Sequence, residues 1–258
     1  MTPSSIDTVA SALIMARCGH RPHDAAPLAG KLASAADAYA VQERVAREFG
    51  WFADGGAPRY WKSGGPSREA MPTHAPLPPA GVWTSPAHGG AWPFHMRGIE
   101  AEIALRLACE VDAARAGRLG AESAAELVDA MAVSIELVDS RWQQGLDAPA
   151  LFKLADLQSH GALVLGEWMP FDLARDWRAQ SCRVRIGAQA AVERTGTHAM
   201  NDPAFVLAAW LRHATRDGAC LQAGTVVTTG TWVGVLEASA GEAVRVEFDG
   251  IGAAEVAL

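Results

Sequence analysis

The sequence has 258 residues, of which 50% are hydrophobic and 20% are charged, and its formal net charge is −7. This composition is typical of a globular protein with a sizeable core, and the negative charge without a Lys/Arg cluster argues against binding to nucleic acid or to anionic membranes. No apolar run reaches the length of a membrane-spanning helix, and the first residues lack the basic segment of a signal peptide, so we expect a cytoplasmic protein.

Two amphipathic helices are predicted at the start of the chain, one with an apolar stripe over residues 10–16 and one over residues 37–49. A segment rich in Gly and Pro, residues 53–58, separates them from a short strand predicted at residues 59–62. Residues 64–93 are dense in Gly, Pro, His and Ser. Such a composition indicates either a long functional loop or a linker.

The rest of the chain is predicted to be mainly strand. An amphipathic helix is expected over residues 123–131 and another over residues 202–214, with Asp202 as its N-cap and Pro203 as its first helical residue. Strands are predicted at residues 98–105, 132–139, 162–165, 182–186, 190–192, 225–228, 233–236, 243–248 and 254–257. Helices early in the chain and strands late indicate an α+β protein with a largely β core.

The strand at residues 98–105 carries two glutamates, Glu100 and Glu102, in an otherwise apolar run. Residues two apart in a strand lie on the same face, about 7 Å from each other along the backbone. Taken alone, this alternation is typical of a half-exposed strand whose acidic side chains face water.

Glu136 lies in a second apolar strand, at residues 132–139. Carboxylates brought together in a core repel one another and have raised pKa values unless a cation neutralises them. Mg²⁺ and Mn²⁺ prefer oxygen ligands, so Glu136 and the two glutamates of the preceding strand are candidate ligands of a hard divalent metal ion. The alternative interpretation is a structural ion pair between Glu136 and Arg141 or another cation.

Lys62 follows two aromatic residues and precedes Gly64 and Gly65. This setting suits an ammonium group that is partly desolvated and directed into a cleft, where a lysine with a lowered pKa can move a proton. The alternative is a solvated lysine at the end of a strand, and the local sequence does not separate the two.

A hydroxyl-rich turn is predicted at residues 228–231, where Thr229 and Gly230 offer a hydroxyl and an unhindered backbone N–H. Such a turn suits the binding of a carboxylate, although β-hairpins use the same residue types. His198 precedes the helix at residues 202–214 and is expected either to line the same cleft or to lie in a surface turn. Spacing alone assigns no role to four other histidines, His20, His23, His74 and His160.

Taken together, these segments resemble the 2-keto-4-pentenoate hydratase and 4-oxalocrotonate decarboxylase family, within the fumarylacetoacetate hydrolase superfamily. The resemblance extends along nearly the whole chain, and it is the order of the segments that is specific. The segments that carry it are residues 38–42, 62–64, 98–104, 135–141, 154–156, 159–166 and 224–234.

The resemblance implies an α+β fold with a mixed β-sandwich roll. Residues 1–80 would form a small, mainly helical α/β lobe and residues 81–258 the catalytic β-roll, as a single structural unit. It also implies homo-oligomers, a bound Mg²⁺ or Mn²⁺, a small 2-oxo acid substrate that chelates the metal, and Lys62 in proton transfer. The implied metal ligands are Glu100, Glu102 and Glu136. The implied substrate-binding residues are Lys153, Asp156, Gln158, Thr229 and Gly230.

Two positions depart from the family pattern. Many hydratases carry an Asp that works with the lysine in the loop before the metal-binding strand, and here the corresponding residues 78–83 contain no carboxylate. Leu157 replaces an Asn that commonly follows the Ala–Asp pair. The resemblance therefore supports chelation and enolisation of a 2-oxo acid more strongly than it supports hydration.

We therefore expect a lyase of aromatic catabolism that acts through a metal-stabilised enolate. It would hydrate a 2-keto-4-pentenoate-type substrate or decarboxylate an oxalocrotonate-type one. One alternative is C–C bond hydrolysis of an acylpyruvate, for which His74 and Glu69 are the candidate base and its carboxylate. The other alternative is a catalytically silent homologue that binds a metal and a 2-oxo acid.

Overall fold

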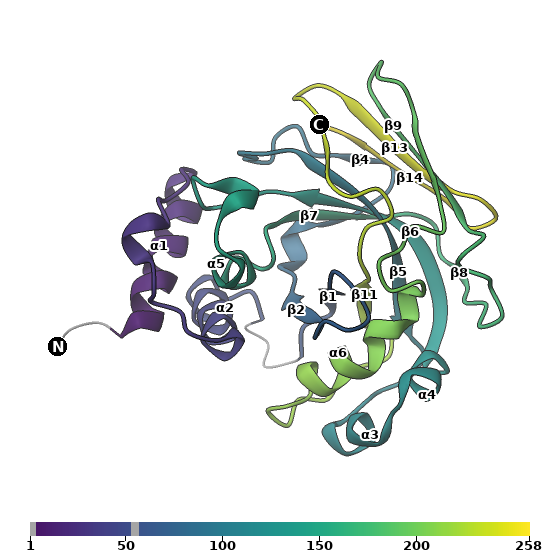
Figure 1. Cartoon of the computed structure of the whole chain (residues 1–258), viewed down its shortest axis with the longest axis horizontal. Helices are drawn as coiled ribbons and strands as arrows, with labels where there is room; N and C mark the ends of the chain where they lie inside the picture. The colour runs from purple at the N-terminus through teal and green to yellow at the C-terminus, as the bar shows by residue number, and fades with distance from the viewer. Residues whose placement is uncertain (1–3, 53–56) are drawn as a thin grey trace.

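The computed structural model describes residues 4–52 and 57–258, so residues 53–56 of the predicted Gly/Pro-rich segment lie outside the described residues. Two β-sheets share one apolar core, and the helices lie around this β core (Figure 1). The predicted α+β class is confirmed. Among the described residues, no helix is long and apolar enough to cross a membrane.

Both predicted N-terminal helices are present, and their ends follow from the local sequence. Helix α1 begins after the N-cap Ser4, and α2 begins with a capping box between Ser34 and Asp37. Gly50, with a φ of 61°, ends α2 in the left-handed conformation that glycine adopts readily. The helices are α1 (Ser5–Gly19), α2 (Ala35–Phe49), α3 (Ala113–Arg118), α4 (Ala121–Ala125), α5 (Ala150–Ala155) and α6 (Leu207–Ala214).

The larger sheet has nine strands among the described residues, in the order β2-β1-β11-β5-β6-β7-β3, with β12 paired to β5 and β8 paired to β6. Its two long central strands, β5 and β6, are antiparallel, whereas β1 runs parallel to β11. The strands of this sheet are β1 (Tyr60–Gly64), β2 (Thr73–Pro76), β3 (Val82–Thr84), β5 (Gly98–Leu107), β6 (Val128–Val138), β7 (His160–Leu165), β8 (Met169–Pro170), β11 (Val226–Thr228) and β12 (Leu236–Glu237).

The smaller sheet has the order β10-β9-β13-β14-β4. Its strands are β4 (Ala87–His88), β9 (Ser181–Ile186), β10 (Val192–Thr195), β13 (Ala243–Phe248) and β14 (Gly252–Ala257). Apolar side chains of this sheet, such as Val184 and Val246, form one buried cluster with Ile99, Ile103 and Ile135 of the larger sheet. One face of β5 and β6 therefore packs against the core between the sheets, and the opposite face is available for a site.

Short edge strands occupy the segment that was predicted to be a loop or linker, residues 64–93. Strand β2 pairs with β1, β3 with β7, and β4 with β14. Strands of two to four residues carry no measurable periodicity, so the Gly/Pro-rich composition conceals them. The division of the chain at residue 80 stays a prediction, and β1 and β2, which precede it, pair within the larger sheet.

Two predicted elements have different bounds in the structure. The helix predicted over residues 123–131 is wrong beyond α4, because Val128 already begins β6 and pairs with β5. The helix predicted over residues 202–214 begins as a 3-10 turn at Pro203–Val206 and continues as α6, while Asp202 caps it by accepting a hydrogen bond from the Ala204 N–H.

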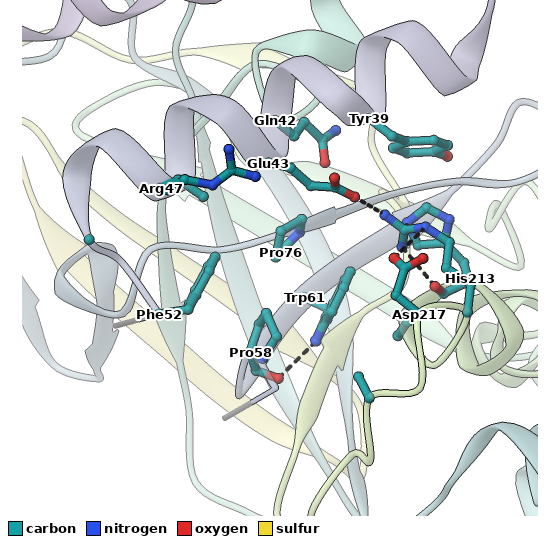
Figure 2. A pocket seen from close by; sticks show the side chains of 15 residues that line it. Tyr39, Gln42, Glu43, Arg47, Phe52, Pro58, Trp61, Pro76, His213 and Asp217 are labelled. Carbon is teal, nitrogen blue, oxygen red and sulfur yellow. Dashed lines mark hydrogen bonds and ion pairs between the residues drawn. The ribbon is translucent and has the colours of Figure 1, made fainter. Parts of the chain in front are cut away.

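A cavity of about 440 Å³ lies between α2 and the segment that ends α6 (Figure 2). Trp61 of β1 lines it, and an ion pair between Glu43 and Arg216 joins the two helical segments beside it. Neither Lys62 nor any of the three predicted metal ligands is among its lining residues. Because neighbouring residues of a strand point to opposite faces, Lys62 points away from the cavity that Trp61 lines. The chemistry predicted for Lys62 therefore does not take place in this cavity.

Candidate metal site and adjoining cavity

The two faces of β5 have different environments. Glu100 is paired with Glu136 across the β5/β6 ladder, and Glu102 is paired with Ser134, so the three glutamates lie on the same face. Glu102 is 2% exposed and Glu136 is fully buried. The interpretation of a half-exposed strand with acids in water is therefore wrong for Glu102, because β11 continues the sheet beside β5 and Thr228 of β11 donates a hydrogen bond to Glu102. Glu100 is half-buried.

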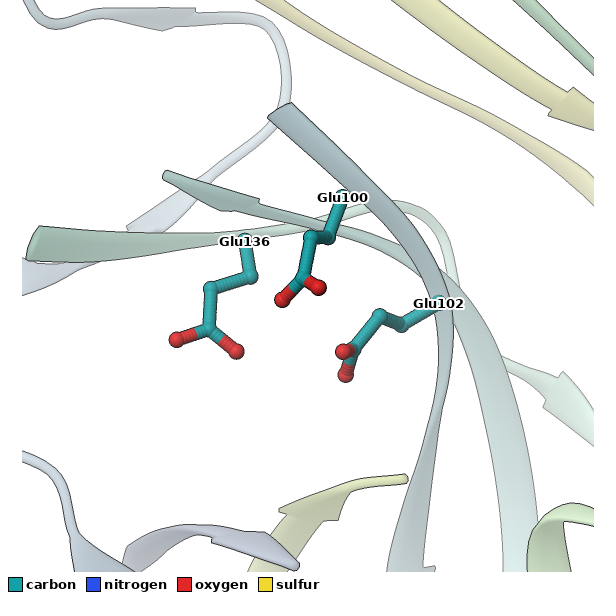
Figure 3. Close-up of side chains that lie close together, drawn as sticks. All are labelled: Glu100, Glu102 and Glu136. Carbon is teal, nitrogen blue, oxygen red and sulfur yellow. The ribbon is translucent and has the colours of Figure 1, made fainter. Parts of the chain in front are cut away.

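The three carboxylates meet at one point. One oxygen from each of Glu100, Glu102 and Glu136 lies within 4.8 Å of the others, and Figure 3 shows the side chains converging from β5 and β6. Burial, and then repulsion by Glu102, raises the pKa of Glu100 to about 8. Burial, and then repulsion by Glu136, raises the pKa of Glu102 to about 7. The cluster thus holds more negative charge than its surroundings neutralise.

The residues present fit a hard divalent cation. The donor set consists of carboxylate oxygens alone, which suits Mg²⁺ or Mn²⁺ and does not suit zinc. The Oε2 atom of Glu136 is buried and has no hydrogen-bond partner among the described residues. A buried carboxylate oxygen without a partner is costly, and a metal ion between the three side chains would satisfy it.

Lys62 reaches the glutamates from β1. It is paired with Thr228 of β11, which is paired with Ala104 of β5, so its side chain lies on the same face of the sheet. Its Nζ donates hydrogen bonds to Glu136 Oε1 and, at 3.2 Å, to the backbone oxygen of Gln158. The cation that pairs with Glu136 is therefore Lys62.

The ammonium group of Lys62 stays protonated in this setting. Burial lowers its pKa, but attraction by Glu136, Glu100 and Glu102 outweighs burial, so the pKa of Lys62 is raised above its ordinary value. The expected lowering is thus not found, because the desolvated lysine lies among three carboxylates. Burial raises the pKa of Glu136, but Lys62 and a hydrogen bond from His160 outweigh it and hold that pKa below its ordinary value.

A cavity of about 330 Å³ opens beside these groups. Its polar lining residues are Lys62, Ser63, Glu100, Glu102, Gln158, His198, Thr228, Thr229 and Thr231, together with Gly230. The Thr228 hydroxyl donates to Glu102, and the Thr229 hydroxyl donates to the Ile103 oxygen at 2.8 Å. The predicted turn therefore borders the cavity, with both of these hydroxyls already engaged by β5.

His198 lines the same cavity, as one of its two interpretations predicted. It is 3% exposed, and its Nε2 lies 2.8 Å from the backbone oxygen of Thr229, to which it donates. Burial lowers its pKa below the ordinary value. A neutral histidine held in this way fixes the turn at Thr229 and Gly230 rather than presenting a free base to the cavity.

Two of the predicted substrate-binding residues have other surroundings. Lys153 donates to the Leu146 oxygen at 2.8 Å and lines a second cavity of about 380 Å³, which shares Glu100 and Gln158 with the first. Asp156 is fully buried and lines neither cavity. It accepts hydrogen bonds from Arg141 Nε at 2.7 Å and from Arg17 at 3.0 Å, which form a structural ion-pair network.

The residues where a family aspartate was expected face a different space. Pro78, Ala80 and Gly81 line a cavity of about 350 Å³ together with Arg17 and Arg141. None of the residues 78–83 lines the cavity beside the glutamates. No carboxylate takes the place of the expected Asp among the described residues that line that cavity, apart from Glu100 and Glu102.

The histidine and glutamate expected to serve a hydrolase do not form a pair. His74 is 4% exposed, and its Nδ1 lies 2.9 Å from the Ser63 hydroxyl oxygen. Burial lowers the pKa of His74 to about 3. Glu69 is exposed to solvent. The structure therefore supplies no activated base from this segment.

Sequence reasoning missed the backbone that follows α5. Leu157, Gln158 and Ser159 have φ angles of 54°, 56° and 59°, a left-handed run that is strained for residues other than glycine, asparagine and aspartate. Asn tolerates this conformation better than Leu, which explains why an Asn suits the position of Leu157. The run directs the Gln158 oxygen toward Lys62.

Comparison with known proteins gives a family and a fold. The family model described as fumarylacetoacetate (FAA) hydrolase C-terminal matches residues 56–258. The 4-oxalocrotonate decarboxylase from Pseudomonas putida G7, solved with calcium and acetate and with magnesium and adipate, has a TM-score of 0.80 and 18% identity, covering 100% of this chain and 98% of that chain. No curated protein matches the sequence.

A second solved structure shares the fold over a shorter stretch. The fumarylpyruvate hydrolase from Pseudomonas aeruginosa, in complex with Mn²⁺ and pyruvate, has a TM-score of 0.56 and 17% identity, covering 78% of this chain and 89% of that chain. At these identities the two proteins show the fold, and the fold that the family resemblance implied is confirmed.

Proposed function

The chain belongs to the fumarylacetoacetate hydrolase family, and we propose that it is a divalent-metal-dependent lyase acting on a small 2-oxo acid. The observation that carries this proposal is the convergence within 4.8 Å of three carboxylates, two of them buried and that of Glu100 half-buried, next to a buried lysine and an open cavity. The relatives named above bind Ca²⁺, Mg²⁺ or Mn²⁺ together with small carboxylates. A homo-oligomeric state stays a prediction.

Glu100, Glu102 and Glu136 would hold Mg²⁺ or Mn²⁺. When all three are ionised, they and Lys62 carry a formal charge of −2, which a divalent cation neutralises. When bound, the cation supplies a Lewis acid that stabilises negative charge developing on the oxygen of a 2-oxo group. Electrostatic stabilisation of this kind often lowers the barrier more than any other single effect.

Lys62 is the residue of this chain that would hold and move the proton. Its ammonium group lines the cavity and is fixed by Glu136 and by the Gln158 oxygen, so its Nζ is oriented as well as charged. An oriented general acid contributes about 10²- to 10⁴-fold to rate. Protonation at carbon by Lys62 completes the enol-to-keto step that hydration and decarboxylation share.

The cavity lining favours decarboxylation of an oxalocrotonate-type acid over hydration of a pentenoate-type acid. Hydration needs a group that activates water, and the described lining residues offer no carboxylate beyond Glu100 and Glu102. Loss of CO₂ needs only stabilisation of the resulting enolate and its protonation.

Two alternatives remain to be tested in the same assays. C–C bond hydrolysis of an acylpyruvate has less support, because His74 is bonded to Ser63 and is not joined to Glu69. A catalytically silent homologue would bind metal and a 2-oxo acid without turnover, and the missing carboxylate in residues 78–83 is the observation that keeps this alternative open.

The test is an assay of purified protein with Mg²⁺ or Mn²⁺ against three substrate types. These are a 2-oxohexenedioate, 2-hydroxypenta-2,4-dienoate and an acylpyruvate, followed by CO₂ release, formation of a 4-hydroxy-2-oxo acid and pyruvate release respectively. We expect metal-dependent CO₂ release that EDTA abolishes. If the acylpyruvate is the only substrate turned over, with release of pyruvate, the protein is a hydrolase and not a lyase. If oxalate binds tightly and no substrate is turned over, the protein is the catalytically silent homologue.

A further inference from the structure

We propose that His160 is a positioning residue for Glu136, held in place by a β-bulge at Gly161, and that it leaves one oxygen of Glu136 free to bind the metal. This inference rests on the metal site of the proposed function. It concerns a histidine to which sequence spacing gave no role, and it concerns how the site is assembled rather than the reaction itself.

The two carboxylate oxygens of Glu136 differ in their hydrogen-bond partners. Oε1 accepts hydrogen bonds from Lys62 and, at 3.2 Å, from His160 Nδ1. Oε2 has no partner among the described residues. With two donors on one oxygen, the carboxylate cannot rotate without breaking both bonds, so Oε2 is the oxygen that stays free for a metal ion. Groups that orient a metal ligand in this way typically control metal affinity.

An irregularity in the β6/β7 ladder brings His160 to this face. Leu163 is paired with Glu136 and lies on the glutamate face, while Ala162 is paired with Leu137 on the core face. Strict alternation would put Gly161 on the glutamate face and His160 on the core face. The register instead shifts after Leu137, and His160 is paired with Val138, which shares the face of Glu136.

Gly161 is the extra residue of this bulge, and its position excludes a side chain. A Cβ atom there would lie 2.7 Å from the Leu137 oxygen and 2.8 Å from Asp139 Cβ. Bulges occur beside active sites, where they redirect a side chain. The bulge at Gly161 has that effect, since it turns His160 from the core between the sheets toward Glu136.

The polar ring of His160 is poorly suited to a purely stabilising role. His160 is 2% exposed, and its Nε2 has no hydrogen-bond partner among the described residues. A buried polar atom without a partner costs about 1–3 kcal/mol. An apolar side chain of similar volume would avoid that cost, so the value of the imidazole lies in the hydrogen bond that Nδ1 donates to Glu136.

The experiment measures Mn²⁺ binding by isothermal titration calorimetry in variants of position 160. His160→Leu removes the donor at similar volume, whereas His160→Asn retains an N–H at the same number of bonds from Cβ as Nδ1. We expect His160→Leu to weaken Mn²⁺ binding about 10- to 100-fold and His160→Asn to stay within about threefold of wild type. Gly161→Ala, which cannot keep the bulge, should weaken binding at least as much as His160→Leu.

Val164→Ala is the matched control, because Val164 is a fully buried residue of β7 on the opposite face, paired with Ile135. It removes core volume without touching the glutamates, so it should lower thermal stability and leave Mn²⁺ affinity unchanged. Equal Mn²⁺ affinity of wild type and His160→Leu would overturn the role of His160 alone, as would a loss in Val164→Ala as large as that in His160→Leu. A wild type that binds no Mn²⁺ would overturn the metal site itself.

Discussion

Replacing Glu102 by Gln should stabilise the metal-free protein and reduce the stability that it gains from metal. The substitution keeps the volume of the side chain and an oxygen that accepts the Thr228 hydroxyl, but it removes one of three neighbouring negative charges. A site built to hold a cation is destabilising without it, because the carboxylates repel one another in a buried environment.

The magnitude follows from the pKa of Glu102, which burial and Glu136 raise from 4.5 to about 7. A carboxyl group with a higher pKa in the folded chain binds its proton more tightly when folded, so its contribution is present below the unfolded pKa. That contribution is lost as the pH rises through the folded pKa. At pH 8 the ionised form therefore costs on the order of 1–3 kcal/mol of unfolding free energy, which the neutral amide avoids.

The assay is urea unfolding at pH 8, with EDTA and with Mn²⁺, for the wild type, Glu102→Gln and the control Glu167→Gln. Glu167 is exposed, so its substitution should change the unfolding free energy by less than about 0.5 kcal/mol. We expect Glu102→Gln to be more stable than wild type in EDTA and to gain less from Mn²⁺. Equal stability of the two proteins in EDTA, with equal gains from Mn²⁺, would refute the reasoning.

Three further outcomes are expected. Lys62→Met should lower turnover about 10²- to 10⁴-fold without weakening Mn²⁺ binding in calorimetry, because it removes the general acid and a competing cation; a lost metal site would contradict this. Mn²⁺ binding should release about two protons at pH 6 and few at pH 9, because the pKa values of Glu100 and Glu102 are about 8 and about 7. Calorimetry in buffers of different ionisation enthalpy measures the number of protons released, and a number that does not change with pH would contradict the prediction. Asp156→Asn should lower the unfolding free energy by about 3–5 kcal/mol in urea, because the buried Arg141 and the half-buried Arg17 both lose the carboxylate that they share. A loss below about 1 kcal/mol would show that the network is dispensable.

The sequence predicted the strands that carry the site, because alternation with a period of two is a local property. Glu100 and Glu102 were expected on one face of a strand, and the structure places them there. The burial of Glu102 was not predictable from that strand, since the neighbouring strand β11, whose Thr228 contacts Glu102, lies far from it in the chain. The ion pair between Glu136 and Lys62 was not predictable either, because 74 residues separate the two in the chain.

Local irregularities of the backbone were beyond the reach of the sequence. Leu157, Gln158 and Ser159 are not residues that favour a left-handed conformation, so their identity does not predict the left-handed backbone that they adopt. The sequence does not predict the bulge at Gly161 either, since a glycine beside a histidine is common in turns and strands alike. Both features depend on tertiary contacts, such as the hydrogen bond from the Asp139 N–H to the Ser159 oxygen at 2.8 Å.

The most direct test of the metal site is a crystal structure of the protein grown with Mn²⁺, with data collected for anomalous scattering. We expect an anomalous peak coordinated by carboxylate oxygens of Glu100, Glu102 and Glu136, including the Oε2 atom of Glu136 that has no partner among the described residues. A map without a peak between these side chains at saturating Mn²⁺, with the Lys62–Glu136 ion pair unchanged, would contradict the proposed metal site.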